Sequence, residues 1–240
     1  MKRKNKKILD ILRVSCNIMS KLKQLIFITL ISVQTISGQN LPTPKDYSII
    51  DTVEGDLNKD SINELVIAYN TQSQNTHENV TRELIIYKKE KNNWIIWKKS
   101  KQALYRSQDG GMMGDPFGEI EIKNGVLLVS QNGGSSWKWG HTDKYRYQNG
   151  EFYLIGYSSN YGRLCDYWED VDFNLLTGKM IVKKEYESCK DDDEQKIYKR
   201  ENETLNKKGL KITIEKREEK EIKIVTPKYK HILYVAQGKI

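Results

Sequence analysis

The feature that most constrains this chain is a recurring motif, a Gly-containing pair between two segments in which apolar and polar residues alternate. Asn124-Gly125 separates residues 120–123 from residues 126–129, and Asn149-Gly150 lies in the same kind of setting. Asn-Gly accepts the positive φ angles that a type I′ turn needs at both central positions, so each pair predicts a two-residue β-hairpin. The chain is therefore expected to fold from antiparallel hairpins.

A two-residue turn also fixes the register of its hairpin, because it determines which residues face each other. The turn at Asn124-Gly125 predicts that Ile122 pairs with Leu127. Thr177-Gly178, interpreted as another turn of this kind, predicts that Phe173 pairs with Val182. In both hairpins the apolar side chains then share one face, which is the pattern of a half-buried strand.

These patterns predict an all-β fold, an antiparallel meander of hairpins. No segment after residue 40 shows helical periodicity over ten or more residues. A sandwich, a curved sheet and an incomplete propeller-like arrangement all fit the hairpins. We interpret residues 40–240 as a single β-rich domain. The Lys- and Glu-rich segment from about residue 207 is a candidate C-terminal hairpin appendage.

Residues 1–39 have the three parts of a secretory signal peptide: a basic start, an apolar run at residues 25–33 and a small-residue exit. Met19 is an alternative start that gives a signal of more usual length. The apolar run is shorter than the roughly 20 residues of a membrane span. An uncleaved membrane anchor is the alternative. We therefore expect a protein that is secreted or held in the periplasm or cell envelope, without a membrane span after signal cleavage.

The positive charge of the chain lies mostly in this leading segment. The whole sequence has 40 Lys and Arg and 32 Asp and Glu. Residues 1–39 hold eight of the basic residues and one of the acidic ones, so the remainder has a net formal charge of +1. A near-neutral domain gives no electrostatic reason to bind nucleic acid, and no nucleic-acid partner is expected.

Two cysteines remain after the leading segment, Cys165 and Cys189. Outside the cytosol an isolated pair most simply forms one disulfide bond. A disulfide between these two residues is therefore predicted.

One stretch, Gly55 to Glu64, carries the residue types of a calcium loop. Oxygen-bearing side chains occur at alternate positions in Asp56, Asn58 and Asp60, and Glu64 follows before an apolar run. Calcium prefers six to eight oxygen ligands, which a tight loop supplies from alternate side chains and one backbone carbonyl. Ile62 is the candidate for that carbonyl, with its side chain turned toward the core. The alternative is an Asx-rich turn that caps its own backbone and holds no ion.

The same stretch resembles the calcium loop of FG-GAP and VCBS-type repeats, Gly-Asp-x-Asn-x-Asp-Gly-x-x-Asp followed by an apolar strand. Ser61 stands at the family's glycine, where positive φ is usual, and Glu64 stands at its last aspartate. The resemblance covers roughly twenty residues and occurs once, so it implies a structural calcium site and not a whole propeller. Residues 112–156 also resemble a set of secreted bacterial proteins with this loop, a resemblance that implies no activity.

Aromatic residues suggest a second candidate site. Trp137 and Trp139 lie two apart and share a face of a predicted strand, with His141 and Tyr153 near them in sequence. Such rings can stack on a sugar or a peptide. The alternative is that the same alternation packs the core.

The sequence therefore predicts an exported β-rich binding or interaction module with a structural calcium loop, whose ligand is an unidentified protein or glycan. An alternative of another class is a secreted hydrolase that uses His141 and Asp143, with Ser135 or Ser136 as the nucleophile. These serines lack the strand–turn–helix setting of Gly-x-Ser-x-Gly hydrolases, so catalysis is not the main expectation. A third alternative is a structural surface protein with an ion-free turn.

Overall fold

The computed structural model describes residues 41–72, 79–91, 93–189 and 195–237. Pro42–Ile240 forms one compact unit. The predicted signal peptide at residues 1–39 lies outside the described residues. Among the described helices, none is long and apolar enough to cross a membrane.

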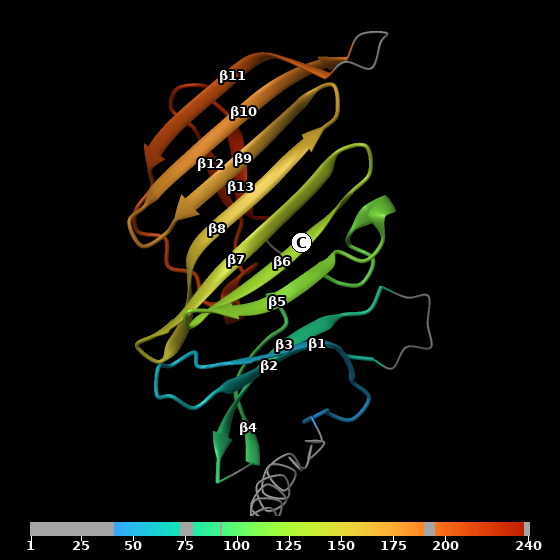
Figure 1. Ribbon diagram of the computed structural model, residues 1–240, viewed down its shortest axis with the longest axis vertical. Helices are drawn as coiled ribbons and strands as arrows, with labels where there is room; N and C mark the ends of the chain where they lie inside the picture. The colour runs from blue at the N-terminus through green and yellow to red at the C-terminus, as the bar shows by residue number, and fades with distance from the viewer. Residues whose placement is uncertain (1–40, 73–78, 92, 190–194, 238–240) are drawn as a thin grey trace, which may run out of the picture. The chain divides into compact units, whose positions relative to one another are not determined.

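The described residues confirm the predicted all-β fold and its hairpin meander. They form three antiparallel sheets of four, seven and two strands, and in each sheet the neighbouring strands follow one another along the chain (Figure 1). The first sheet contains β1 (Ser48–Gly55), β2 (Glu64–Asn70), β3 (Arg82–Glu90) and β4 (Asn93–Ser100). The seven-stranded sheet contains β5 (Phe117–Lys123), β6 (Val126–Gly134), β7 (Lys138–Gln148), β8 (Glu151–Arg163), β9 (Tyr167–Asn174), β10 (Lys179–Cys189) and β11 (Gln195–Asn206). The last sheet contains β12 (Ile222–Val225) and β13 (Ile232–Ala236), and two short 3-10 helices are η1 (Gly111–Met113) and η2 (Ile214–Lys216).

Two of the predicted turns have the expected geometry. Asn124 and Gly125 have φ angles of 54° and 74°, and Asn149 and Gly150 have 50° and 89°. Positive φ at both central positions is the mark of a type I′ turn. The register of the first hairpin follows, since Ile122 pairs with Leu127.

The register predicted for the third hairpin is wrong. Phe173 pairs with Met180 and not with Val182. Only Gly178 has positive φ in this turn, 80°, because the β-branched Thr177 does not adopt the second left-handed position. The turn therefore lengthens and is closed by the backbone N–H of Gly178, which donates to the carbonyl of Asn174 at 2.8 Å. A shift of two residues keeps the same side chains on the buried face.

One hydrophobic cluster joins all three sheets. Val66 of β2, Phe173 of β9 and Leu233 of β13 belong to it and are at most 5% exposed. The chain after residue 207 contributes Ile212 and Ile214, which are also buried in this cluster. The backbone of Ile212 accepts a hydrogen bond from Leu154 N at 2.8 Å. The C-terminal segment therefore covers part of one face of the seven-stranded sheet, which we call the inner face.

The predicted disulfide is present. Cys165 in the β8–β9 turn is bonded to Cys189 at the end of β10, with 5.2 Å between their Cα atoms. It ties two hairpins of the seven-stranded sheet together at the same end of the sheet.

Candidate functional site

The predicted calcium loop connects β1 to β2, and close packing fixes its position. Gly55 and Glu64 face each other at the base of the loop. A Cβ atom on Gly55 would lie 2.7 Å from the Cγ2 atom of Ile122, so glycine is required where β1 packs against β5. A Cβ atom on Gly125 would lie 3.3 Å from the carbonyl oxygen of Asp56. The loop therefore lies directly against the β5–β6 turn.

The carboxylate of Asp56 organises the loop backbone. Its Oδ1 accepts the N–H groups of Lys59 and Asp60 at 2.6 and 3.2 Å, and its Oδ2 accepts that of Ser61 at 2.9 Å. Lys59 and Ser61 have φ angles of 67° and 69°. Ser61 thus adopts the conformation of the glycine that it replaces in the FG-GAP and VCBS-type pattern, although a side chain is disfavoured there.

The other polar side chains of the loop converge on one amide group. Nδ2 of Asn58 donates to Oδ2 of Asp60 at 2.9 Å and to Oε1 of Glu64 at 3.1 Å. Oδ1 of Asn58 accepts the backbone N–H of Asp60 at 2.8 Å. Two carboxylates therefore share one neutral donor, in a place where a cation would neutralise both of them.

Glu64 is the most deeply buried of these carboxylates. It is 1% exposed, and its Oε2 accepts the backbone N–H of Leu57 at 2.7 Å. Burial raises the pKa of the Glu64 carboxyl above its ordinary value, and repulsion from Asp60 and Asp56 acts in the same direction, while the Leu57 hydrogen bond opposes it. A buried carboxylate whose hydrogen-bond donors are neutral gains from a nearby positive charge.

The loop borders a hollow of about 320 Å³. Asn58, Asp60 and Glu64 line one part of it, and Trp97 and Tyr147 line another. This hollow gives solvent a route to the oxygen atoms of the loop.

The side chain of Ile62 does not turn toward the core as expected, because it is 50% exposed. Leu57 supplies the buried apolar anchor of the loop instead, at 2% exposed.

The donor set fits calcium better than a softer metal. Asp56, Asn58, Asp60 and Glu64 offer only oxygen atoms as ligands, which hard cations prefer. No group of three or more His, Cys, Asp or Glu side chains that could hold a metal ion occurs in the described part of the chain. A calcium ion would therefore need the amide oxygen of Asn58 and the carbonyl of Ile62 in addition to the carboxylates.

Three of the four predicted ligand-binding residues come together, and one does not. Trp137, Trp139 and His141 lie along one face of the seven-stranded sheet, and Trp139 stacks on His141 with 6.0 Å between ring centroids. Tyr105 meets Trp139 edge-on at 5.5 Å and covers part of it. Tyr153 pairs with Arg146 on β7 and alternates with the buried neighbours on its strand, so it points to the other face.

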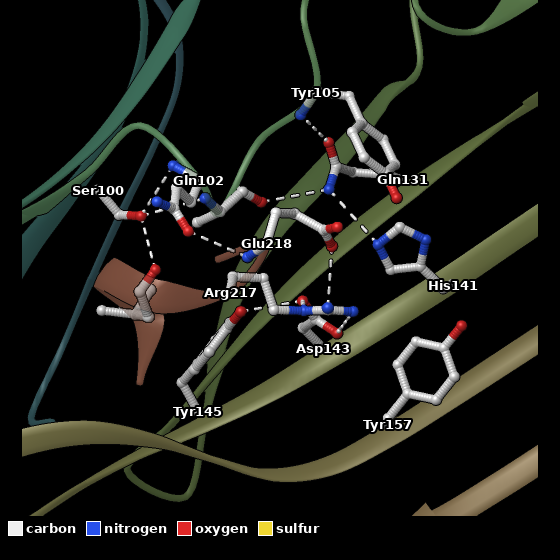
Figure 2. A network of polar contacts seen from close by, with 12 residues as sticks. Ser100, Gln102, Tyr105, Gln131, His141, Asp143, Tyr145, Tyr157, Arg217 and Glu218 are labelled. Atoms are coloured by element: carbon white, nitrogen blue, oxygen red, sulfur yellow. Dashed lines mark hydrogen bonds and ion pairs between the residues drawn. The ribbon is translucent and has the colours of Figure 1, made fainter. Parts of the chain in front are cut away.

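A buried polar network that the sequence did not predict lies beside His141 (Figure 2). Arg217, in the C-terminal segment, donates to Asp143 on β7 from Nε at 2.5 Å and from Nη2 at 3.1 Å. The hydroxyl of Tyr145 donates to the same carboxylate at 2.9 Å, and Nη1 of Arg217 donates to Glu218 at 2.9 Å. Arg217 and Asp143 are 3% and 1% exposed. The network joins the C-terminal segment to the inner face of the sheet.

His141 is held neutral in this setting. Burial lowers its pKa to about 4, with Asp143 raising and Arg217 lowering it. Asp143 is engaged by Arg217 and does not orient the imidazole, whose Nε2 lies 3.5 Å from Nε2 of Gln131. The candidate nucleophile Ser135 lies in the exposed β6–β7 turn, after Gly134, the last paired residue of β6. His141 pairs with Gln131, which lies three residues before Gly134 on β6. The described geometry does not bring nucleophile, base and acid together.

Arg217 gave no useful signal in the sequence, because it lies in a run of Lys and Glu residues that is typical of a solvated turn. Its role depends on a partner 74 residues away, which only the tertiary fold reveals.

A comparison with models of known protein families gives no match, and a comparison with curated proteins finds no relative. The fold and the site define a class of protein only: a disulfide-bonded antiparallel β protein with an oxygen-lined loop at the first hairpin.

Proposed function

We propose that this protein is an exported β-rich binding module whose first hairpin is stabilised by calcium. Asp56, Asn58, Asp60 and Glu64 would hold the ion through side-chain oxygens and Ile62 through its carbonyl. The ion would act structurally, by neutralising the clustered carboxylates and tying the loop to β2. Export is supported by the signal-like leading segment and by the Cys165–Cys189 disulfide, which suits an oxidising compartment.

One observation carries the calcium assignment: a single amide group of Asn58 bridges Asp60 and the buried Glu64. Carboxylates that approach one donor repel each other, and that repulsion is relieved when a cation binds between them and the Asn58 amide turns its oxygen toward the ion. The backbone of the loop is already folded around Asp56, so little ordering is needed on binding.

The test is a thermal melt of the purified protein in excess chelator and in increasing calcium. An ion that binds only the folded state must raise the midpoint as its concentration rises, by about 2.7 kcal/mol of stability at 100 times the dissociation constant. Asp60→Ala should remove most of this rise. Asp172→Ala is the matched control, because Asp172 is an exposed aspartate on β9, outside the loop.

The proposal requires a calcium-dependent rise in wild type and in Asp172→Ala that Asp60→Ala lacks. Identical midpoints with calcium and with chelator in wild-type protein would show that the stretch is an ion-free turn.

A further inference from the structure

A continuous row of aromatic side chains crosses the seven-stranded sheet at its disulfide-bonded end. Successive ring centroids are 5.3, 6.2, 6.0 and 6.2 Å apart. The first contact is a parallel stack, with 12° between the ring planes. The members of this aromatic row, one from the β6–β7 turn and one from each of β8 to β11, are Trp137, Tyr161, Tyr167, Tyr186 and Tyr198.

Cross-strand pairing builds the row. Arg163 on β8 faces Tyr167 on β9, and Tyr167 faces Tyr186 on β10. An irregularity in the β10–β11 register lies next to Tyr186 and places Tyr198 beside it. Residues that are widely separated in sequence therefore form one surface, which is why the sequence pattern around Trp137 predicted only one end of it.

The row is exposed to solvent and does not belong to the core. Tyr161 is 40% exposed and Tyr198 is 62% exposed, and the other three rings are intermediate. No member of the row belongs to the two buried hydrophobic clusters of the described residues. An exposed aromatic strip that the core does not require marks a binding surface.

The charges beside the row are balanced. Arg163 lies over the Trp137 ring at 4.9 Å and pairs with Asp166 at 2.6 Å. Lys199 lies over the Tyr186 ring at 4.7 Å and pairs with Glu201 at 2.7 Å.

Lys184 repeats this arrangement in the middle of the row. Its Nζ lies 3.4 Å from the centroid of Tyr167 and 3.8 Å from a carboxylate oxygen of Glu169. Each of the three cations thus has its own carboxylate, so the charges in contact with these rings are paired.

Polar contacts hold the two central rings of the row in place. The hydroxyl of Tyr186 donates to Glu201 at 2.9 Å, and Lys184 fixes one face of Tyr167. Side chains that are already ordered lose little entropy on binding.

We propose that the aromatic row binds a neutral glycan chain that lies across strands β8 to β11. This inference rests on the proposed binding function and names its ligand class. The C–H-rich faces of sugar rings pack on aromatic rings, and sugar hydroxyls are satisfied by tyrosine hydroxyls and by the outer atoms of the ion pairs. A neutral polymer matches the balanced charge, whereas an anionic one would need unpaired cations.

A protein partner fits these observations less well. The centres of protein interfaces are depleted of charged residues, and here a paired charge lies beside three of the five rings. Leu164, at 59% exposed in the β8–β9 turn, and Ile197, next to Tyr198, are the large aliphatic side chains nearest to the row in sequence.

Affinity electrophoresis of the full chain tests the proposal. Native gels would contain neutral polysaccharides of several linkages (β-glucans, xylans, mannans and galactans), anionic ones (alginate and polygalacturonate) or none. We expect at least one neutral polysaccharide to retard the wild-type protein. Tyr161→Ala and Tyr198→Ala should each weaken retardation about five- to tenfold, as expected for the loss of one aromatic contact.

Tyr234→Ala is the matched control, because Tyr234 on β13 is 43% exposed and has Lys223 beside its ring at 5.9 Å but lies outside the row. This variant should be retarded as strongly as wild type. Each variant is also melted with and without calcium, so that loss of folding is separated from loss of the glycan surface.

Several results would overturn the inference: no retardation by any neutral polysaccharide, retardation by anionic polysaccharides alone, or an equal loss of retardation in Tyr234→Ala. Binding of a protein partner that the row variants lose, without any glycan binding, would assign the row to a protein interface and also overturn it. A calcium-dependent melt that persists in these cases would leave the calcium-supported module standing and reject only its glycan ligand.

Discussion

Arg217 and Asp143, 74 residues apart in the sequence, form a bidentate ion pair between the C-terminal segment and β7. Both side chains are almost fully buried, so each charge depends on the other for compensation. Glu218 and Tyr145 complete the hydrogen bonding of the pair. The pair fastens the segment that covers the inner face of the seven-stranded sheet.

Removal of one partner should therefore be costly. Arg217→Met leaves Asp143 as a buried carboxylate without its cation, and we expect it to lower the free energy of unfolding by about 3–5 kcal/mol. Urea denaturation measures this loss. Arg106→Met is the control, because Arg106 is exposed and its pair with Asp109 should contribute at most about 1 kcal/mol. Equal midpoints for the two variants would contradict a structural role for the buried pair.

The half-buried imidazole of His141 should make stability depend on pH. Its folded-state pKa of about 4 lies below the ordinary value of 6.5, so the unfolded chain binds the proton first as pH falls. The contribution of His141 to stability should be constant above about pH 6.5 and should fall from there toward pH 4, by at most about 3 kcal/mol.

His141→Phe removes this titration and keeps an aromatic ring between Trp139 and Tyr157. The difference in unfolding free energy between variant and wild type should shift in favour of the variant between pH 6.5 and 4. A constant difference across this range would show that His141 is protonated as easily in the folded protein as in the unfolded chain.

The sequence predicted local features well and distant contacts poorly. The Asn-Gly turns fixed both the hairpin and its register at Ile122 and Leu127, because their φ requirements are local. The register predicted from Thr177-Gly178 was wrong, because a β-branched residue avoids the left-handed region. The turn is therefore longer than two residues. The pairing of Tyr167 with Tyr186 follows from the register that the sequence did not predict, so the aromatic row could not be predicted from residue spacing alone.

In the β1–β2 loop, too, the local features were predicted and the contacts with distant residues were not. The alternate oxygen-bearing residues predicted a tight turn, with an Asx-rich turn that caps its own backbone as one interpretation, and Asp56 does accept the backbone N–H of Ser61. The prediction that the Ile62 side chain turns toward the core was wrong, because Leu57 already fills the apolar space beneath the loop. Which of two apolar residues in a tight turn is buried depends on the neighbouring hairpin, here the β5–β6 turn at Gly125.

The disulfide should contribute strongly to stability. Cys165 and Cys189 are 24 residues apart, and a loop of this size corresponds to about 3.5 kcal/mol in the chain-entropy treatment. The double variant Cys165→Ser/Cys189→Ser should lose roughly this amount in urea denaturation, and a reducing agent should destabilise wild type but not the variant. A reducing agent that lowers both midpoints equally would indicate that the stability of the protein does not depend on this bond.

The final prediction concerns Ser61, whose φ of 69° is disfavoured for any residue with a Cβ atom. Ser61→Gly should raise stability by about 0.5–1 kcal/mol, because relief of the backbone strain outweighs the extra freedom of glycine in the unfolded chain. Ser61→Ala keeps a Cβ atom and should show no such gain. The Asp56 carboxylate holds the backbone N–H of Ser61, so we expect the same backbone strain with and without calcium. The calcium-dependent rise in melting midpoint should therefore be the same in Ser61→Gly as in wild type. A larger rise in the variant would show instead that calcium imposes the conformation of the loop.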